Sequence, residues 1–396
     1  MISVDEAVTR IMSAFTPLEP EPIAVGAAAG RVLAANVLAK LDQPPFPVSS
    51  MDGYAVRSVD VTQAGVMLNV IGSAPAGHPF AGRIDPGQAV RIFTGGVVPE
   101  GADAIVIQED TTADGTKVTC QVAAQKGRHI RVAGLDFKSG ECIGETGHRL
   151  TARDLALIAA GDVSLVSVCR RPKIALVATG DELSLPGAAR KPGGIVASSG
   201  YALSAQISAW GGEPTDLGIL PDTSQAVASI AEKSQGADLI VTLGGASVGD
   251  HDLIQKALGP KGFALDFWKI AMRPGKPLIF GRLGKTPLLG LPGNPVSTLV
   301  CALLFLKPAI AAMLGLSAPT TTSTAKLMTD LKENDGRQDY VRAKLEIVNG
   351  ERCVRPFAVQ DSSMLSTFAQ ADALIVRAVH APRVAAGESV SILLLE

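Results

Sequence analysis

The sequence is poor in aromatic residues, in net charge and in paired cysteines. Aromatic residues make up 4% of the 396 residues, which disfavours a surface that stacks on nucleic-acid bases. The formal net charge is −2, so no general attraction to nucleic acid or anionic membranes is expected. The five cysteines are scattered without a C-x-x-C pair, which predicts a reducing compartment rather than a disulfide framework or a thiolate zinc site.

Membrane segments and common nucleotide motifs are also missing. The most apolar run, residues 299–306, is followed by Lys307-Pro308 and is too short to cross a bilayer. The first residues, MISVDEAV, carry no basic segment, so no signal peptide is predicted. Neither G-x-G-x-x-G nor G-x-x-x-x-G-K-[ST] occurs, which argues against Rossmann and Walker sites. We therefore expect a cytoplasmic protein with no membrane or nucleic-acid partner.

The length and the turn residues predict several domains. A chain of 396 residues exceeds what one core normally organises, and 41 glycines and 25 prolines suggest many tight turns. The predicted fold class is multidomain α/β plus β. The predicted parts are a discontinuous N-terminal domain at 1–42 and 141–170, a strand-rich insert at 43–140, a central doubly wound α/β domain at 171–317 and a small β-barrel-like domain at 318–396.

Local patterns support these parts. Ser3 and Glu6 have the spacing of a capping box before a helix, and a second helical pattern covers residues 30–39. Thr151 is the expected N-cap of another helix. Asn349-Gly350 lies between two strand patterns and predicts a hairpin.

Residues 239–252, LIVTLGGASVGDHD, are the most informative stretch. A buried parallel strand at 239–243 is followed by glycines and then by a helix start, which together make an anion site. Asp250 and Asp252 fit a divalent cation that lies between the loop and a phosphate. They fit equally well as caps of the following helix.

The same stretch also fits a hydrolase. Residues 245–249 match G-x-S-x-G, the nucleophile elbow, with Ser247 as nucleophile. A hydrolase of that type needs an acid and then a histidine further along the chain. His251 is too close to suit that order, and His380 lies in a strand-rich region, so this alternative is the weaker one.

Acidic residues follow the ends of several predicted strands in the central region. Glu182, Asp222, Asp250 and Asp252 each come after such a strand. Because ligands of doubly wound sheets bind beyond the carboxyl ends of the strands, these side chains could share one rim.

Basic residues and a second helix start follow. Residues 268–277 carry Lys269, Arg273 and Lys276 around a Pro-Gly turn. Residues 288–298 give a strand, a Pro-Gly-Asn-Pro loop and a helix start with Ser297, which suits an oxyanion. Acidic and basic clusters side by side suit a metal-bridged phosphate ester.

Outside the central region the local signals are weaker. Three prolines before Asp52 would fix that carboxylate in place, although an ordinary turn is the alternative. Thr94 and Asp136 are ordinary turn residues on local grounds. Arg342 and the polar 361–363 loop are candidates near the carboxyl end.

Six motifs then agree in order and spacing: PPFPVSSMDGYAV, RIFTGGVVPEGADAIV, KIALVATGDEL, GGASVGDHD, MRPGKP and GLPGNPVS. Together they resemble the MoeA-type molybdopterin molybdenumtransferases, the family that includes the gephyrin E domain. The central domain resembles the MogA-type adenylyltransferases. The resemblance implies a homodimer, with each site shared between subunits, that inserts molybdenum from molybdate into adenylylated molybdopterin and releases AMP with Mg²⁺. Molybdopterin adenylyltransferase and molybdoenzymes are the implied protein partners.

The resemblance also implies roles for individual residues. The catalytic set is Asp52, Glu182, Asp222 and Asp252, and the last three would hold the metal. The set that binds substrate or molybdate is Thr94, Asp136, Gly244, Gly245, Ser247, Lys269, Arg273, Lys276, Pro292, Pro295, Ser297, Arg342 and Ser362.

The chain departs from the family pattern at a few positions. Thr223 stands where Asp or Asn is usual, Ser199 where Asn is usual and Arg273 where Lys is frequent. The loop around Ser362 lacks an expected glycine. A scaffold that binds the ligand without turnover is a further alternative, although clustered carboxylates would add little to it.

Overall fold

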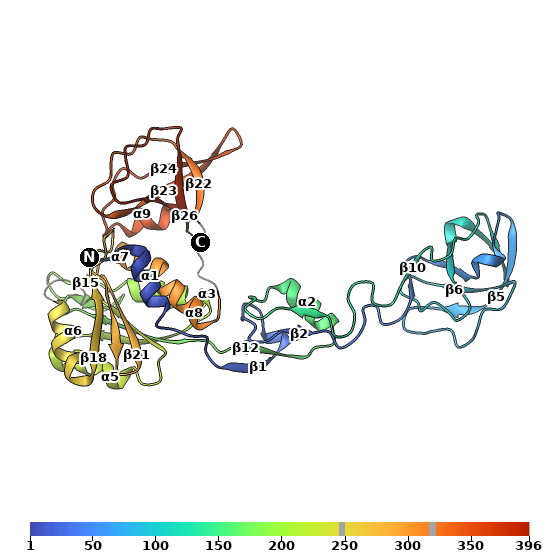
Figure 1. Ribbon diagram of the computed structural model, residues 1–396, viewed down its shortest axis with the longest axis horizontal. Coiled ribbons are helices and arrows are strands. Elements are labelled where there is room, and N and C mark those ends of the chain that lie inside the picture. The colour runs from blue at the N-terminus through green and yellow to red at the C-terminus, as the bar shows by residue number, and fades with distance from the viewer. Residues whose placement is uncertain (245–249, 317–321, 396) are drawn as a thin grey trace. The chain divides into compact units, whose positions relative to one another are not determined.

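The computed structural model describes residues 1–244, 250–316 and 322–395, with the backbone alone at 250–252. The chain divides into two compact units, one made of Met1–Glu21 and Cys169–Glu396 and the other of Pro22–Val168. We call them unit 1 and unit 2 and describe each by itself (Figure 1).

Unit 1 contains the central α/β sheet that the sequence predicts. Its strand order is β16-β13-β17-β21-β20-β18. The first four strands are mutually parallel, while β20 is antiparallel to both of its neighbours. The strands are β16 (Glu213–Leu220), β13 (Lys173–Thr179), β17 (Leu239–Leu243), β21 (Thr286–Leu291), β20 (Ile279–Leu283) and β18 (Phe263–Trp268). The doubly wound domain is thus confirmed.

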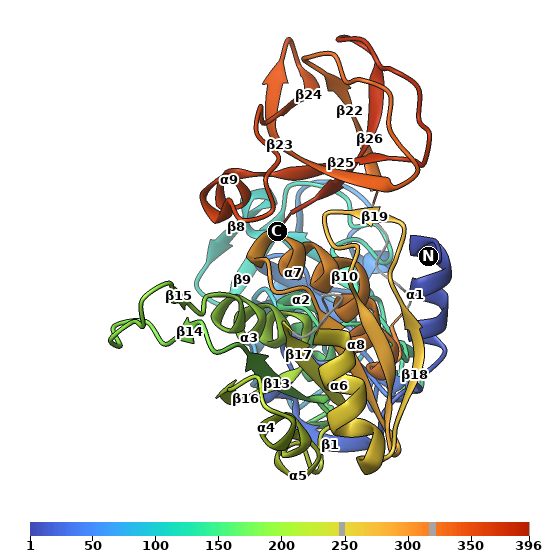
Figure 2. The same cartoon turned by 90° about the vertical axis from the view of Figure 1, so that its left-hand side faces the viewer.

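Helices pack on both faces of this sheet (Figure 2). One face buries a core of aliphatic side chains with α4 (Ser224–Ala228), α5 (Ile230–Lys233) and α6 (Asp250–Leu258), and a 3₁₀ turn at Gly259–Lys261 follows. Across the sheet, α3 (Ser199–Trp210) contacts β13 and β16, and α7 (Pro295–Cys301) contacts β21.

One long helix departs from the sequence prediction. It continues from α7 through a π-helical turn (Ala302–Leu306) into α8 (Lys307–Met313), so it extends past Lys307-Pro308, where the sequence analysis ends the apolar run. The wider π turn lies where the proline ring would otherwise meet the preceding turn. The 19 residues from Pro295 to Met313 are long and apolar enough to cross a membrane, but 78% of the apolar window is buried inside the protein. That burial is typical of a core helix.

The first helix, α1 (Val4–Met12), is capped as expected. The N–H of Glu6 donates to Ser3 Oγ at 3.1 Å. The helix contacts α8 and belongs to unit 1, whereas the predicted boundaries assign it to the N-terminal domain. The domain boundaries themselves stay predictions.

A closed five-stranded barrel forms the carboxyl-terminal part of unit 1 (Figure 2). Its strands pair in the circular order β23-β24-β22-β26-β25, and β25 returns to β23. The strands are β23 (Gln338–Val348), β24 (Glu351–Pro356), β22 (Thr322–Leu327), β26 (Ser389–Leu394) and β25 (Ala373–Arg377). The short β19 (Met272–Arg273) pairs with β23, and α9 (Leu365–Gln370) precedes β25. Asn349 and Gly350 have positive φ in the predicted hairpin turn.

Unit 2 is built mainly on a second six-stranded sheet. Its strand order is β7-β4-β6-β5-β9-β8, with one core on each face. The strands are β7 (Ala104–Ile107), β4 (Gly53–Val56), β6 (Gln88–Ile92), β5 (Val66–Ala74), β9 (Lys117–Cys120) and β8 (Thr111–Asp114), and 3₁₀ turns lie at Ser58–Asp60 and Gln108–Asp110. The strand-rich insert is confirmed.

The rest of unit 2 has a separate small core. It contains α2 (Ala152–Ala160), which begins with a capping box between Thr151 and Asp154. Two strand pairs and one 3₁₀ turn complete it: β1 (Pro20–Ala24) with β12 (Leu165–Cys169), β2 (Val37–Leu38) with β11 (Cys142–Gly144), and Val25–Ala27. A further pair, β3 (Val48–Ser49) with β10 (Ile130–Arg131), belongs with the six-stranded sheet, because Ile130 packs against one of its cores.

The helix predicted over residues 30–39 is wrong. Gly30 has φ of +72°. The Leu33 N–H then donates to the His148 carbonyl and the Ala34 N–H to the Ser167 carbonyl. Pairing with distant segments therefore replaces the helical bonds that the apolar spacing suggested.

Candidate functional site

The loops that follow the parallel strands of unit 1 meet at one edge of the sheet. The Gly180 N–H, just after β13, donates to the carbonyl of Leu220 at the end of β16 (3.2 Å). The Gly244 N–H, just after β17, donates to the carbonyl of Leu291 at the end of β21 (3.2 Å). The carboxyl ends of four strands are thus joined in pairs, as the sequence predicts for a ligand site.

A cavity of about 640 Å³ lies at this edge, and we call it the edge cavity. Its lining combines the strand-end loops, the start of α7, the beginning of α9 and the short paired strands β14 (Leu183–Ser184) and β15 (Ile195–Val196). Six residues of the predicted site line it: Glu182, Asp222, Gly244, Pro292, Pro295 and Ser297.

Glu182 depends on the glycine two residues before it. Gly180 has φ of +154°, and a Cβ placed there would lie 2.6 Å from Glu182 Oε2 and 2.8 Å from Oε1. The carboxylate therefore occupies the space that a side chain at 180 would fill. Alanine at position 180 would therefore adopt an unfavourable backbone angle and displace the Glu182 carboxylate, which is the flexible end of an exposed side chain.

Asp222 is linked to the Glu182 loop through the backbone. Its N–H donates to Asp181 Oδ1 at 3.4 Å, so the loops after β13 and β16 are joined beside both acidic residues. The two exposed carboxylates line the same cavity and offer the hard oxygen ligands that Mg²⁺ prefers. Among the described side chains no group of three acidic, histidine or cysteine residues could hold a metal ion. Glu182 and Asp222 are the two described carboxylates of the edge cavity that could give oxygen ligands to Mg²⁺.

Thr179 is a cavity residue that the sequence prediction missed. It is the last residue of β13 and is buried, and its Oγ1 has no hydrogen-bond partner in the described part of the chain. A buried hydroxyl without a partner at a cavity wall suits a ligand that supplies one. Its position at a strand end, three residues before Glu182, is the signal that could have found it.

Ser199 and Ser363 also line the edge cavity. Ser199 begins α3, and Ser363 comes from the carboxyl-terminal part of the chain. Ser363 donates both its N–H and its Oγ–H to Asp361 Oδ1, at 2.8 and 2.6 Å, and these bonds lower the pKa of that carboxyl. The predicted Ser362 is one residue away from the lining position.

Ser362 accepts two hydrogen bonds at the start of α7. The Val296 N–H donates to the Ser362 carbonyl at 3.2 Å, and Asn294 Nδ2 donates to Ser362 Oγ at 3.0 Å. One helix N–H that was expected to face an oxyanion is thus used inside the protein. Ser297 remains part of the cavity wall.

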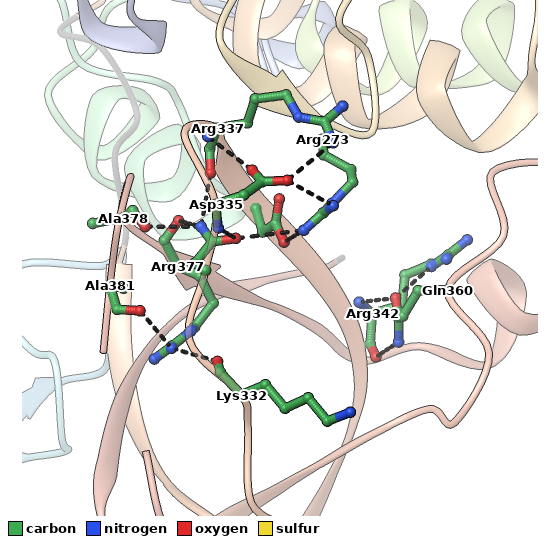
Figure 3. A network of polar contacts seen from close by, with 11 residues as sticks. Arg273, Lys332, Asp335, Arg337, Arg342, Gln360, Arg377, Ala378 and Ala381 are labelled. Atoms are coloured by element: carbon green, nitrogen blue, oxygen red, sulfur yellow. Dashed lines mark hydrogen bonds and ion pairs between the residues drawn. The ribbon is translucent and has the colours of Figure 1, made fainter. Parts of the chain in front are cut away.

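Arg342 supports this loop from the barrel (Figure 3). Its side chain is buried, and the guanidinium donates to the Asp361 carbonyl (2.6 Å) and to Gln360 Oε1 (3.0 Å). Burial lowers the pKa of Arg342. Instead of lining the edge cavity, Arg342 fixes the segment that carries Ser362 and Ser363.

Arg273 is held by two carboxylates (Figure 3). It pairs with Asp335 at 3.2 Å and, through a short contact, with Asp339. Hydrogen bonding to Asp339 raises its pKa. The residue lines a second cavity in the barrel and is absent from the lining of the edge cavity.

The two predicted lysines lie near the edge without lining the cavity. Lys269 follows β18, whose carboxyl end lies at the same edge as that of β21, and its Nζ stacks over the Trp268 ring at 3.6 Å. Lys276 is exposed and precedes Pro277, which lines the cavity.

Asp52, Thr94 and Asp136 belong to unit 2. The Thr94 N–H and Oγ1 both donate to Asp52 Oδ1, at 2.7 and 2.9 Å. These bonds hold the pKa of Asp52 below its usual value. Asp136 is exposed, and its N–H donates to the Gln43 carbonyl. Two separate sequence motifs thus meet at an ionised carboxylate.

Three predicted site residues cannot be placed. Gly245 and Ser247 lie outside the described residues, and the hydrolase alternative rests on Ser247. Asp252 lies in the first turn of α6, where only the backbone is described.

Comparison with known proteins identifies the family. Three family models match consecutive parts of the chain: the MoeA N-terminal region (domain I and II) at 2–161, a "Probable molybdopterin binding domain" at 175–312 and the MoeA C-terminal region (domain IV) at 324–395. The molybdopterin molybdenumtransferase of Haemophilus influenzae is 36% identical, over 99% of this chain and 98% of its own length. This chain belongs to the MoeA family.

Other relatives agree with this assignment. The molybdopterin molybdenumtransferase of a Nostoc species is 34% identical over 95% of this chain and 89% of its own length. The crystal structure of a molybdopterin biosynthesis MoeA protein from Pyrococcus horikoshii superimposes with a TM-score of 0.87 at 28% identity, and it covers 100% of this chain and 99% of that chain. The predicted resemblance to MoeA proteins is confirmed.

Proposed function

We propose that this chain is a molybdopterin molybdenumtransferase, which inserts molybdenum from molybdate into adenylylated molybdopterin and releases AMP. The observation that carries the proposal is the edge cavity of a MoeA-family chain, in which Glu182 and Asp222 lie at adjacent strand ends. Beside them are the buried Thr179 hydroxyl and the start of α7, which suit a phosphate-bearing ligand.

Glu182 and Asp222 would hold Mg²⁺, with Asp252 as a third candidate ligand. When bound, the ion would neutralise charge on the phosphates of the anhydride and on the departing AMP. Gly180 leaves the space that the Glu182 carboxylate occupies, and the bond from the Asp222 N–H to Asp181 keeps the second loop beside the first. The two loops thus bring two oxygen ligands to the same cavity.

Predicted and newly found residues together bind and orient the two substrates. The predicted Ser297 and the newly found Thr179 and Ser363 offer hydroxyl groups at the cavity wall, while the predicted Lys269 and Lys276 add positive charge near the same edge for the molybdate dianion. Gly244 has φ of +88°, and a Cβ there would lie 2.8 Å from the Thr179 carbonyl, so the backbone can approach a ligand closely.

A homodimer completes the site. A second copy of the chain supplies Asp52, Thr94 and Asp136, as the family resemblance implies. The two bonds from Thr94 stabilise the ionised form of Asp52 and hold its carboxylate in one position, so it can orient the reacting group. The enzyme works in the cytoplasm, between a molybdopterin adenylyltransferase and the molybdoenzymes that receive the product.

The test is AMP release from adenylylated molybdopterin with Mg²⁺, measured with and without molybdate. We expect release to require molybdate and to disappear in Glu182→Ala. Glu213→Gln is the matched control, because Glu213 is an exposed carboxylate at the opposite end of β16.

Three outcomes would contradict the proposal. Equal AMP release without molybdate would remove the insertion step. Binding of the substrate without any turnover would favour a scaffold. Cleavage of activated esters that depends on Ser247 and ignores molybdate would favour the hydrolase.

A further inference from the structure

The inner face of the barrel becomes polar at one end. Along β23, Val341 and Ala343 contribute to the barrel core, and along β25 so do Ala373 and Ile375. Side chains two residues apart share a face of a strand. Asp339 and Arg377 therefore continue this inner face beyond the core, and they lie directly opposite each other in the antiparallel pairing.

Arg377 is a buried cation without a carboxylate partner. It is 6% exposed, and its Nη2 donates to the carbonyls of Lys332 (3.0 Å), Ala381 (3.4 Å) and Pro382 (Figure 3). Among the described residues no acidic side chain forms an ion pair with it. A buried guanidinium whose charge is not balanced by a carboxylate favours the binding of an anion.

Asp339 lies opposite with one oxygen unused. It is 8% exposed, and its Oδ2 accepts a hydrogen bond from Arg273. Its Oδ1 is buried and has no hydrogen-bond partner in the described part of the chain. Leaving a buried carboxylate oxygen unpaired is costly, so a ligand that donates a hydrogen bond here is favoured.

Both residues line a cavity of about 520 Å³, which we call the barrel mouth. Four basic and three acidic side chains line it, and Leu331, Val341, Pro356 and Phe357 add apolar wall. Mouths of barrels are common ligand sites. The volume exceeds that of a bare oxyanion and leaves room for an organic group.

We propose that the barrel mouth binds a phosphate monoester in its singly protonated form. Arg377 pairs with the anionic oxygens, and Asp339 Oδ1 accepts the hydrogen bond from the remaining P–O–H group. The organic part lies against Val341, Pro356 and Phe357. Inorganic phosphate carries the same anionic oxygens and P–O–H group. A sulfate ester carries one negative charge but has no O–H group to donate to Asp339.

The test compares two esters of the same shape. Phenyl phosphate and phenyl sulfate are titrated into the full-length protein by calorimetry at about pH 5.5, without divalent cations. Because phosphate monoesters have a second pKa of about 6, phenyl phosphate is then mostly a monoanion, like phenyl sulfate. We expect phenyl phosphate to bind at least about tenfold more tightly, and this advantage to disappear by about pH 8.

Asp339→Asn is the decisive variant, with Asp330→Asn as its control. Asn can still accept from Arg273 while its amide faces the mouth, so the preference for phenyl phosphate should be lost. Asp330 lines the same cavity but is bound to Arg383 and to the Ala386 N–H, so its variant should keep the preference.

A titration with inorganic phosphate tests whether the ligand is a phosphate ester or free phosphate. Inorganic phosphate that binds more weakly than phenyl phosphate supports an ester. Equal affinity would overturn the assigned role of the apolar wall.

Two results would overturn the proposal as a whole. One is equal affinity of wild-type protein for the two phenyl esters, which can be measured even if the variant fails to fold. The other is a correctly folded Asp339→Asn protein that keeps the wild-type preference.

Discussion

The edge cavity and the barrel mouth differ in the charge of the side chains that line them. Carboxylates and hydroxyls line the edge cavity, and no Lys or Arg is among its described lining residues. Four basic residues line the barrel mouth. An acidic cavity takes a phosphate only with the help of a cation, whereas a basic one binds it directly. If both proposals hold, ligand binding should depend on a metal ion at the edge cavity and on a proton at the barrel mouth.

The largest loss of AMP release is expected when the Glu182 carboxylate at the edge cavity is removed. Glu182→Gln should lower Mg²⁺-dependent AMP release by about 100-fold or more, the scale seen when one group that stabilises transition-state charge is lost. It should also abolish any rise in melting temperature produced by Mg²⁺. Differential scanning fluorimetry with increasing Mg²⁺ checks this independently of turnover. An unchanged response to Mg²⁺ would remove Glu182 from the metal site.

The binding of phenyl phosphate at the barrel mouth offers the internal control for this variant. Glu182 does not line that cavity, so the affinity should equal that of the wild-type protein. A parallel loss there would mean that the two regions are not independent.

A smaller loss is expected when the space behind Glu182 is filled. Gly180→Ala places a Cβ 2.6 Å from the Glu182 carboxylate and should lower AMP release by about tenfold or more. Gly187→Ala is the matched control, because Gly187 also has a positive φ (+79°) but nothing within 4 Å of its added Cβ. If both variants lose the same activity, backbone strain rather than displacement of Glu182 explains the loss.

The sequence predicts the edge cavity better than the barrel mouth for a physical reason. Glu182 and Asp222 directly follow parallel strands, and the carboxyl ends of such strands always meet at one edge. Asp339 and Arg377 face each other only because β23 pairs with β25 in one register. Turn residues predict the β23–β24 hairpin, but no local pattern predicts the distant pairing that closes the barrel.

The roles of the arginines could not be predicted in the same way. The sequence identifies Arg273 and Arg342 as cations near the site, and their geometry depends on residues far along the chain. Asp335 and Asp339 pair with the first, and the 360–361 segment binds the second. The residue type shows that a side chain is charged, but only the tertiary structure shows which groups that side chain contacts.

A moderate loss of stability is expected when Arg342 is replaced. Arg342→Lys removes the guanidinium bonds to Gln360 Oε1 and the Asp361 carbonyl, keeps the two bonds between Gln360 and the Arg342 backbone, and should lower the free energy of unfolding by about 1–3 kcal/mol. Chemical denaturation checks the stability. We also expect weaker AMP release, because the loop with Ser363 is less well held. If the variant is as stable as the wild-type protein, these bonds make no net contribution to the free energy of unfolding.

The smallest effect concerns a carboxylate held by hydrogen bonds rather than by a cation. Thr94→Val removes the Oγ1 bond to Asp52 and keeps the backbone bond, so the depressed pKa of Asp52 should rise partway toward its usual value. The acid limb of the activity profile should move to higher pH, because Asp52 then gains its proton earlier as the pH falls. Carboxyl ¹³C NMR titration checks the shift. An unchanged or lower pKa would contradict the role of Thr94.

Strand β23 serves both regions with alternate residues, and this limits how its length can vary during evolution. Asp339 faces the barrel mouth, and Arg342, on the other face, holds the loop at the edge cavity. Inserting or deleting one residue between them would place both side chains on the same face of the strand. Substitutions can therefore tune each region separately, but a change of length would disturb both at once. The hairpin tip at Asn349 and Gly350, beyond these contacts, is where extra residues can be accommodated.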